Sequence, residues 1–385
     1  MILVYFGMAI HVSDFFDLPD DVVYLNCASF SPQLRAVTAA GQQAVLRKSF
    51  PWKIHSAAMI EEPEALRRLV SQVLNTSADG VALIPSVSYG VGVAAANLPI
   101  GKGQHIVVLD KDFPSNYYTW REHAIRNQAT IETVTPAVNE SWTEAILNAI
   151  TERTAIVSVA NCHWTNGAYI DLVRVSARVK AVGAALVIDA SQSLGVLPLD
   201  LDLIQPDFVV SVGYKWLLGP YGLGYLYAAP KWREAGVPLE YSWLAKQGSD
   251  DFANLVNYRN DYRPGARRFD MGEYSSFIHI PMAIQAVQQV LDWGVPNIQQ
   301  QLRGITHYIA KKAIALNIQY PREHVDHMLG LEFPVAIPGG LKEAFERERI
   351  YVSFRGNSIR IAPYLFTTTE DVDRLFEVIA KSARV

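Results

Sequence analysis

Between residues 80 and 213 the sequence alternates short apolar, β-rich runs with segments of helical period, and this alternation constrains the fold more than any other feature. The β-rich runs are GVALIPS, HIVVLD, TIETVTP, TAIVSVAN, AALVIDA and DFVVSVG. In the helical segment SWTEAILNAI, Ser141 and Glu144 have the spacing of a capping box. Strands that alternate with helices usually form parallel sheets with both faces covered. The sequence therefore predicts an α/β fold with a mostly parallel central sheet and helices on both faces.

The pattern changes after residue 270. A helical segment from Pro281 to Trp293 leads into a mixed C-terminal part. Its last segment, TTTEDVDRLFEVI, places apolar residues at the i, i+3, i+4, i+7 spacing of an amphipathic helix. We expect a large domain over residues 20–270 and a smaller α+β domain built from residues 1–19 and 271–385.

Composition excludes several classes of protein. Half of the 385 residues are hydrophobic, and 34 Lys and Arg against 38 Asp and Glu give a formal net charge of −4. We expect neither a nucleic-acid nor a membrane partner, because the sequence lacks a basic surplus and an apolar run of about 20 residues. The apolar start lacks the basic region and cleavage site of a signal peptide. Two cysteines, Cys27 and Cys162, form no disulfide framework or zinc site, so we expect a cytoplasmic enzyme without a metal.

A single lysine, Lys215, stands between the apolar run 208–212 and a glycine-rich turn that precedes another strand. A lysine here either extends its amine to water or carries a reactive amine. One helix-and-strand unit earlier, a strand ends at Asp189, with Gln192 three residues further on. Ligands of such sheets bind at the carboxyl ends of the strands, so these side chains are candidates for one site.

Two further strand ends carry candidate groups. Ser88 follows one strand at an expected helix start, where free N–H groups and the helix dipole favour a phosphate. Phe113 and Asn116 follow another strand. A pyridoxal 5′-phosphate (PLP) site needs an amine, an acid partner for the ring nitrogen, a phosphate cradle and a flat face against the ring. The strand ends together predict such a site.

Three motifs taken together resemble one family. They are DASQ (189–192), GYKWLLGPYGLGYLY (213–227) and RGNSIRIAPYLFTTTEDVDRL (355–375). These motifs resemble the class V aminotransferase family of fold-type I PLP enzymes, which includes cysteine desulfurases, selenocysteine lyases, kynureninases and isopenicillin-N-epimerase-like proteins. The resemblance extends from YLNCASFSP (24–32) to the C-terminal helix, and it implies PLP as cofactor, an amino-acid substrate and a homodimer.

The resemblance also implies roles for individual residues. Lys215 corresponds to the Schiff-base lysine and Asp189 to the partner of the ring nitrogen, and these two are the expected catalytic residues. Gln192 corresponds to a contact of the ring's phenolic oxygen. The remaining expected cofactor contacts are Val87, Ser88, Phe113, Asn116 and Tyr214. Arg360 corresponds to the arginine that binds the substrate α-carboxylate, and Asn26 is a second expected substrate contact.

Each of these assignments has an ordinary alternative. Asp189 and Ser88 could be helix N-caps. Phe113 could belong to the core, and Arg360 to a surface ion pair. NCHWTNG (161–167) replaces the family's SN..G pattern and leaves His163 and Trp164 as candidate wall residues of the site, for which core or subunit-contact roles are more common than catalytic ones.

Two further departures from the family bear on the function. Cysteine desulfurases carry a nucleophilic cysteine before the matching arginine, but YVSFRGNSIRIAP contains none, so we do not expect persulfide-forming desulfuration. Glu273 stands where the family often has a threonine that reaches the partner subunit's phosphate, and Ser275 or Ser276 could replace that threonine.

Several functions remain open at this stage. Transamination is the default, as the family's broad activity, and β-elimination from a cysteine-like or selenocysteine-like substrate and epimerisation are the alternatives. A catalytically inactive PLP-fold binding protein is more remote, because both Lys215 and Asp189 are present. A nicotinamide-dependent enzyme is disfavoured, because GPYGLG precedes a strand and not a helix.

Overall fold

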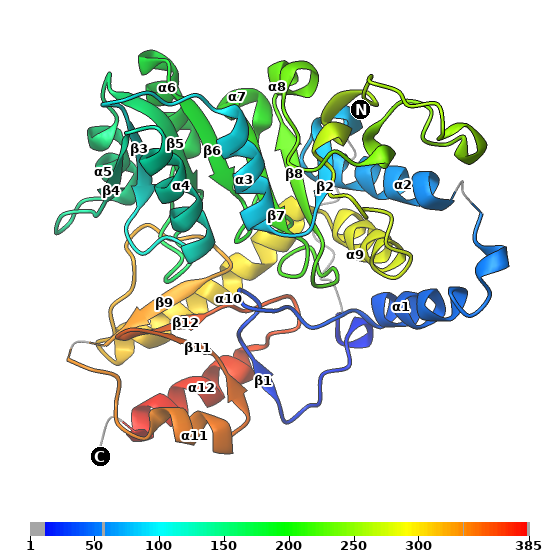
Figure 1. Cartoon of the computed structure of the whole chain (residues 1–385). Coiled ribbons are helices and arrows are strands. Elements are labelled where there is room, and N and C mark those ends of the chain that lie inside the picture. Colours follow the sequence, from blue (N-terminus) through cyan, green and yellow to red (C-terminus); the bar gives the residue numbers. More distant parts are fainter. Residues whose placement is uncertain (1–11, 56–57, 334, 383–385) are drawn as a thin grey trace, which may run out of the picture.

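A computed structural model describes residues 12–55, 58–333 and 335–382 of the chain. Residues 1–11, which include most of the apolar start and part of the expected small domain, lie outside this range. The described residues form a larger α/β part, with a smaller part below it in the view of Figure 1.

Within the described residues, the larger part is built on a seven-stranded sheet with the order β2-β8-β7-β6-β5-β3-β4. Its strands are β2 (Val81–Ile84), β3 (His105–Leu109), β4 (Thr130–Val134), β5 (Thr154–Ala160), β6 (Ala185–Asp189), β7 (Phe208–Val212) and β8 (Gly224–Ala228). The pairs from β7 across to β4 are parallel, and β8 is antiparallel to both β7 and β2. The mostly parallel sheet predicted from the sequence is confirmed.

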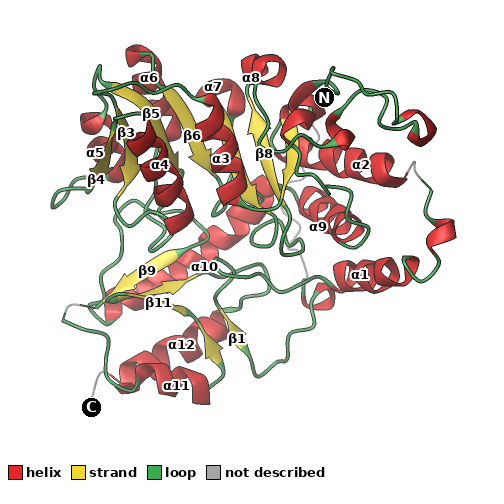
Figure 2. Ribbon diagram, in the orientation of Figure 1, coloured by secondary structure: helices red, strands yellow, loops and turns green. Residues whose placement is uncertain are grey.

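Except at the edge strand β4, which is largely exposed, both faces of the sheet are buried, which explains why the other strands are largely apolar rather than alternating. On β3, Ile106 and Val108 join an apolar cluster with α3 and α4. Val107 and Leu109 join the larger cluster on the opposite face, with residues of α2, α5, α6 and α9. Figure 2 shows α3 and α4 in front of the strands.

The helices of the larger part follow the strands as expected. They are α1 (Arg35–Arg47), α2 (Ala58–Val73), α3 (Val87–Asn97), α4 (Pro114–Arg126), α5 (Trp142–Ala149), α6 (Leu172–Val182), α7 (Leu201–Ile204), α8 (Pro230–Ala235) and α9 (His279–Trp293). Ser141 caps α5 by accepting a hydrogen bond from Glu144 N, as the capping-box spacing predicts. The Glu144 carboxylate pairs with Arg174, so only this half of the predicted box is observed.

The smaller part contains two short sheets packed on helices. A three-stranded antiparallel sheet has the order β11-β12-β9, and β1 pairs with β10 in parallel. These elements are β1 (Val23–Tyr24), β9 (Leu329–Glu332), β10 (Ile350–Tyr351), β11 (Ser353–Arg355), β12 (Ser358–Ile361), α10 (Val295–Ala315), α11 (Leu341–Arg347) and α12 (Thr369–Ser382). The four apolar residues spaced along α12 are buried, which confirms the predicted amphipathic helix.

A third apolar cluster fills the smaller part and includes Val23 and Leu25 from the N-terminal region. In contrast, α9 packs against α1 and α2 of the larger part. The exact domain boundaries stay a prediction.

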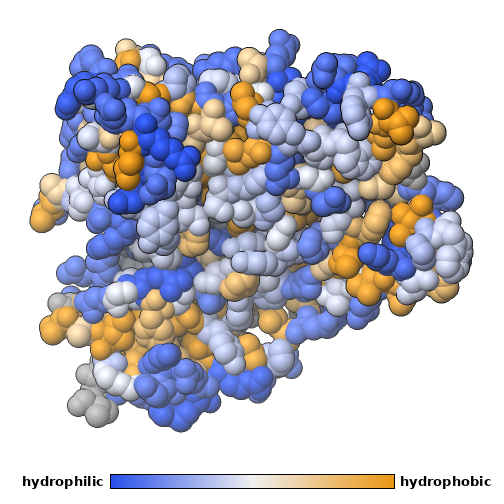
Figure 3. All heavy atoms as spheres, viewed as in Figure 1, coloured by the Kyte–Doolittle hydropathy of each residue, from blue (hydrophilic) through white to orange (hydrophobic). Residues whose placement is uncertain are grey.

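No helix in the described part of the chain is both long and apolar enough to span a bilayer. The face in Figure 3 is largely hydrophilic with scattered apolar patches, some of which lie over α1 and the segment that follows it.

Candidate active site

The candidate residues lie where strands end, at the edge of the sheet that faces the smaller part in Figure 1. Asp189 is the last residue of β6, and Lys215 follows the end of β7 by three residues. Residues 110–113 connect β3 to α4, and residues 85–86 connect β2 to α3. The strands β3, β6 and β7 run in one direction, and so does β2, because β8 is antiparallel to both β2 and β7. Their carboxyl ends therefore share one edge of the sheet, and the structure brings together side chains that are far apart in the sequence.

Lys215 is buried, with 8% of its surface exposed. Its Nζ lies 5.7 Å from the ring centroid of Phe113 and 5.9 Å from that of Tyr214. Burial lowers the pKa of Lys215 to about 8, while the Asp189 carboxylate opposes this shift and Arg360 adds to it. The alternative of a turn lysine with its amine in water is therefore wrong. The neutral, nucleophilic form of the amine becomes accessible close to neutral pH.

Both carboxylate oxygens of Asp189 are held in place. Oδ1 accepts a hydrogen bond from Ser191 N, and Oδ2 accepts one from Asn116 Nδ2, each at 2.9 Å. The residues that follow Asp189 form turns, so Asp189 does not cap an α-helix and that alternative is wrong. Asn116 is buried, and its own Oδ1 is buried without a partner among the described residues.

A second acid, Asp112, was missed from the sequence. Its Oδ1 accepts hydrogen bonds from Phe113 N at 2.6 Å and from Asn116 Nδ2 at 3.3 Å, so one amide group connects Asp112 and Asp189. Burial and the Asp189 charge raise the pKa of Asp112 to about 7. The signal in the sequence was its position directly before Phe113, at the end of a buried strand.

A small cavity joins the two acids to aromatic side chains. It is lined by Leu109, Asp112, Phe113, Ala160, Cys162, Trp164, Asp189 and Gln192. Phe113 is 39% exposed and meets the Trp164 ring edge-on at 5.6 Å, so its assignment to the core is wrong. Cys162 donates to the Gln192 carbonyl at 3.6 Å, and burial raises the pKa of its thiol to about 12. That thiol is therefore held in its unreactive protonated form.

The start of α3 offers backbone donors, as predicted. The N-cap, however, is Ser86, whose Oγ accepts from Tyr89 N at 3.2 Å, so the alternative of Ser88 as N-cap is wrong. Ser88 occupies the second helical position, is exposed, and shares a hydrogen bond with Ser86 Oγ at 2.9 Å. The N–H groups of Val87 and Ser88 belong to the first turn, where no intrahelical acceptor exists.

Gln192 and Tyr214 are fixed by neighbours from other elements. Gln192 is buried, donates to the Ala28 carbonyl at 3.0 Å and accepts from Trp216 Nε1 at 3.1 Å. The Tyr214 ring stacks on Phe30, with 5.4 Å between centroids. These contacts orient both side chains, and their predicted roles toward a cofactor remain predictions.

Arg360 lies on β12 and is almost completely buried. It donates to the Trp164 carbonyl and to Ser29 Oγ, each at 2.7 Å, and its Nε is buried without a partner among the described residues. Burial, and then the neighbouring Arg355, lower the pKa of Arg360 to about 9. The alternative of a surface ion pair is wrong for this residue.

Asn26 follows β1 and forms a β-bridge with Ala362, just after β12. Its Oδ1 is also buried without a partner in the described structure. Asn26 and Arg360 thus both lie beside the end of β12, although their predicted contacts with a substrate remain predictions.

His163 is a buried structural residue. Its ring stacks on Trp142 at 4.6 Å, and its two nitrogens contact the Asp110 carbonyl at 2.9 Å and Thr165 Oγ1 at 2.7 Å. Glu273 is exposed, whereas Ser276 Oγ accepts from His279 N at the start of α9.

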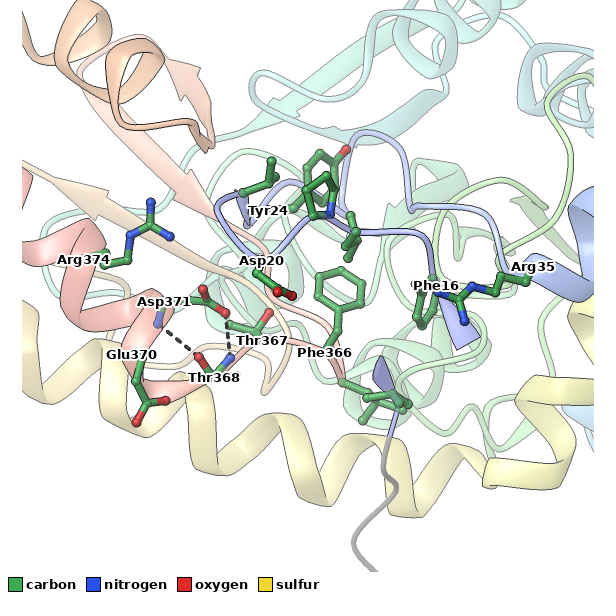
Figure 4. A pocket seen from close by; sticks show the side chains of 15 residues that line it. Phe16, Asp20, Tyr24, Arg35, Phe366, Thr367, Thr368, Glu370, Asp371 and Arg374 are labelled. Carbon is green, nitrogen blue, oxygen red and sulfur yellow. Dashed lines mark hydrogen bonds between the residues drawn. The ribbon is translucent and has the colours of Figure 1, made fainter. Parts of the chain in front are cut away.

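A separate hollow lies between residues 12–24 and the start of α12, shown in Figure 4. Its lining includes Phe16, Phe366 and Arg374 but none of the predicted site residues. Thr368 and Asp371 satisfy each other's backbone N–H groups there, in the manner of a helix-capping pair. We do not assign this hollow to the active site.

The family model "Aminotransferase class-V" matches residues 23–312. The chain belongs to the class-V aminotransferase family. Among its relatives, the uncharacterized aminotransferase YcbU of Bacillus subtilis (strain 168) is 25% identical over 341 residues, which cover 88% of this chain and 87% of YcbU. Isopenicillin N epimerase of Streptomyces clavuligerus is 23% identical over 392 residues, which cover 94% of this chain and 95% of the epimerase.

The fold also matches solved structures over most of the chain. A variant of C-DES with glycine covalently linked to its PLP cofactor superposes with a TM-score of 0.83 at 17% identity, covering 94% of this chain and 97% of that one. Fold type I, expected from the resemblance, is thereby confirmed. Class-V aminotransferases are PLP-dependent enzymes.

The residues of this family member suit such a cofactor. Lys215 supplies a buried amine, and Asp189 an acid at the neighbouring strand end. The start of α3 supplies backbone donors for a phosphate, and Phe113 and Trp164 supply flat apolar faces beside the acids. The buried, unpartnered Asn116 Oδ1 leaves one acceptor in the same place for a further donor.

Proposed function

We propose that this protein is a PLP-dependent enzyme that acts at the α-carbon of a free amino acid, and that its reaction is transamination. One observation carries the proposal. A buried amine, Lys215, lies beyond the end of β7, an acid, Asp189, ends the neighbouring β6, and the buried Arg360 donates to the carbonyl of Trp164, which lines the same cavity as Asp189. This set of charges suits a substrate with an amino and a carboxylate group on one carbon.

Each of three residues of the chain would then have a separate role in the reaction. Bound PLP supplies an electron sink for the negative charge that develops at the α-carbon. Arg360 would hold the α-carboxylate with a planar guanidinium, whose geometry matches a carboxylate better than an ammonium does. Lys215 Nζ would take the α-proton, since its lowered pKa makes the neutral base available. The Asp189 carboxylate would keep the ring nitrogen protonated.

Epimerisation is the second candidate, because the isopenicillin N epimerase of Streptomyces clavuligerus aligns with 94% of this chain. A desulfurase that transfers sulfur to its own cysteine as a persulfide is less well supported. Residues 353–361 form the short β11–β12 hairpin here, and this stretch contains no cysteine.

The test is a single-turnover reaction of the PLP-loaded protein with an amino acid and no acceptor. Transamination predicts one equivalent of keto acid per site and a shift of the visible absorbance, whereas epimerisation gives the enantiomer without keto acid, and elimination releases ammonia. Lys215→Ala should abolish turnover. Lys311→Ala, which changes an exposed lysine of α10, should behave as wild type. No spectral response to any amino acid would contradict the proposal.

We also propose that the protein is a cytoplasmic homodimer. Exposed aromatic residues support an interface, and they gather in the segment 241–258, as Tyr241, Trp243, Phe252 and Tyr258. Cys27 and Cys162 are both free and buried, in keeping with a reducing compartment. Light scattering on a size-exclusion column would measure the mass, and a monomer at micromolar concentration would contradict the dimer.

A further inference from the structure

The hairpin β11–β12 presents a second arginine beside the carboxylate-binding one. Its register pairs Ser353 with Arg360 and Arg355 with Ser358. Directly paired residues of an antiparallel ladder share a face, and so do residues two apart on one strand. Arg355 and Arg360 therefore project from the same face of the hairpin, at diagonal positions.

Both arginines meet the same residue of the larger part, Trp164. Arg360 Nη1 donates to the Trp164 carbonyl at 2.7 Å, and the Arg355 guanidinium carbon lies 5.2 Å from the centroid of the Trp164 ring. The same ring lines the cavity that contains Asp189 and meets Phe113 edge-on. Trp164 thus places Arg355 next to the proposed substrate position.

Among the described residues, neither arginine of this region has a carboxylate partner. Arg355 donates only to the carbonyl of Phe354 among the hydrogen bonds of the described part, and its Nε is buried without a partner there. Burial lowers the pKa of Arg355, and its charge in turn helps to lower the pKa of Arg360 and of Lys215.

A substrate with a neutral side chain would leave one of these two arginines without a counterion. The α-carboxylate of a substrate would neutralise Arg360 alone. The nearby acids are Asp189, assigned to the ring nitrogen, and Asp112, which shares the Asn116 amide with it. Arg355 would still face the substrate side without an anion.

We propose that Arg355 binds a second carboxylate, on the side chain of the substrate, so that the enzyme selects dicarboxylic amino acids of the aspartate or glutamate class. This inference rests on the proposed function and adds the substrate class to it. A stack of Arg355 on Trp164 with no role in recognition is the competing interpretation, and the following experiment separates the two.

The experiment measures binding, by titration calorimetry, of dicarboxylates that have no amine to the PLP-loaded protein. Succinate and glutarate are compared with their monoamides, which keep the size and remove one charge. An added charge-assisted hydrogen bond predicts a preference for the diacid of about tenfold or more. Arg355→Gln should remove this preference, and Arg355→Lys should restore part of it. Arg347→Gln, an exposed arginine of α11, is the matched control and should keep it.

Arg360→Gln should weaken the binding of the diacid and of the monoamide equally, because both compounds place a carboxylate at the position of the substrate α-carboxylate. Equal binding of diacids and monoamides by wild type, a preference that survives Arg355→Gln, or no binding of either compound would each overturn the inference. If amino acids still change the visible absorbance in such a case, the proposed function stands and only the substrate class is wrong. If they do not, the proposed function fails as well.

Discussion

The lowered pKa of Lys215 predicts how the PLP-free protein captures PLP as the pH changes. Only a neutral amine attacks an aldehyde, so the capture rate should follow the neutral fraction of Lys215. With a pKa lowered from 10.5 to about 8, that fraction is about one-tenth at pH 7, against about 0.03% for an ordinary lysine. Burial thus makes Lys215 about 300 times more available at pH 7.

Stopped-flow absorbance would measure the capture rate between pH 6 and pH 10. We expect the rate to rise almost tenfold per pH unit up to about 7 and to level off above about 9. The reaction of PLP with a lysine-containing peptide, measured over the same range, corrects for the ionisation of PLP itself.

Two variants test the causes of the shift in opposite directions. Arg360→Gln removes a cation and should raise the pKa of Lys215, whereas Asp189→Asn removes an anion and should lower it. A wild-type rate that keeps rising tenfold per unit to pH 10 would refute the reasoning, because it would mean that Lys215 titrates as an exposed lysine.

Three further predictions concern other residues. Asp189→Asn should retain PLP but lower turnover by about 10²- to 10³-fold in steady-state assays, and an unchanged rate would mean that another acid serves the ring nitrogen. Arg360→Gln should weaken amino-acid binding by about 2–4 kcal/mol, seen as an increased apparent Kd with cofactor absorbance intact, and an unchanged Kd would remove its role. Arg67→Met leaves Asp270 buried without its 2.8 Å ion-pair partner, so urea unfolding should show a loss of about 3–5 kcal/mol. Arg303→Met removes a half-exposed arginine from its ion pair with Asp326 and should cost much less free energy of unfolding, and equal losses in the two variants would contradict this reasoning.

The sheet was predictable because local sequence determines its strands. β5, β6 and β7 are buried on both faces, so each is a continuous apolar run, and the residue that ends the run marks the carboxyl edge. Asp189 and Lys215 were found in this way, with one helix and one strand, α7 and β7, between them. The family motifs then supported their roles independently.

The contacts within the site were less predictable, because they join residues that are distant in sequence. Asn116 donates a hydrogen bond to Asp189, which is 73 positions away in the sequence, and Arg360 donates one to Ser29, which is 331 positions away. Ser88 was a possible N-cap in the sequence, but α3 begins at Val87 and its N-cap is Ser86, because two nearby serines can both fit a helix start and only the backbone geometry separates them. The position of Arg355 depends on the hairpin register, which short strands with few apolar residues leave unspecified in the sequence.

The most direct measurement of the central proposal locates the cofactor on the chain. The protein, loaded with PLP, is reduced with borohydride, digested and examined by peptide mass spectrometry. We expect one dominant modified peptide, with the added mass on Lys215, and its disappearance in the Lys215→Ala variant. Modification of a different lysine, or equal modification in wild type and variant, would contradict the assignment of Lys215 as the lysine that holds PLP.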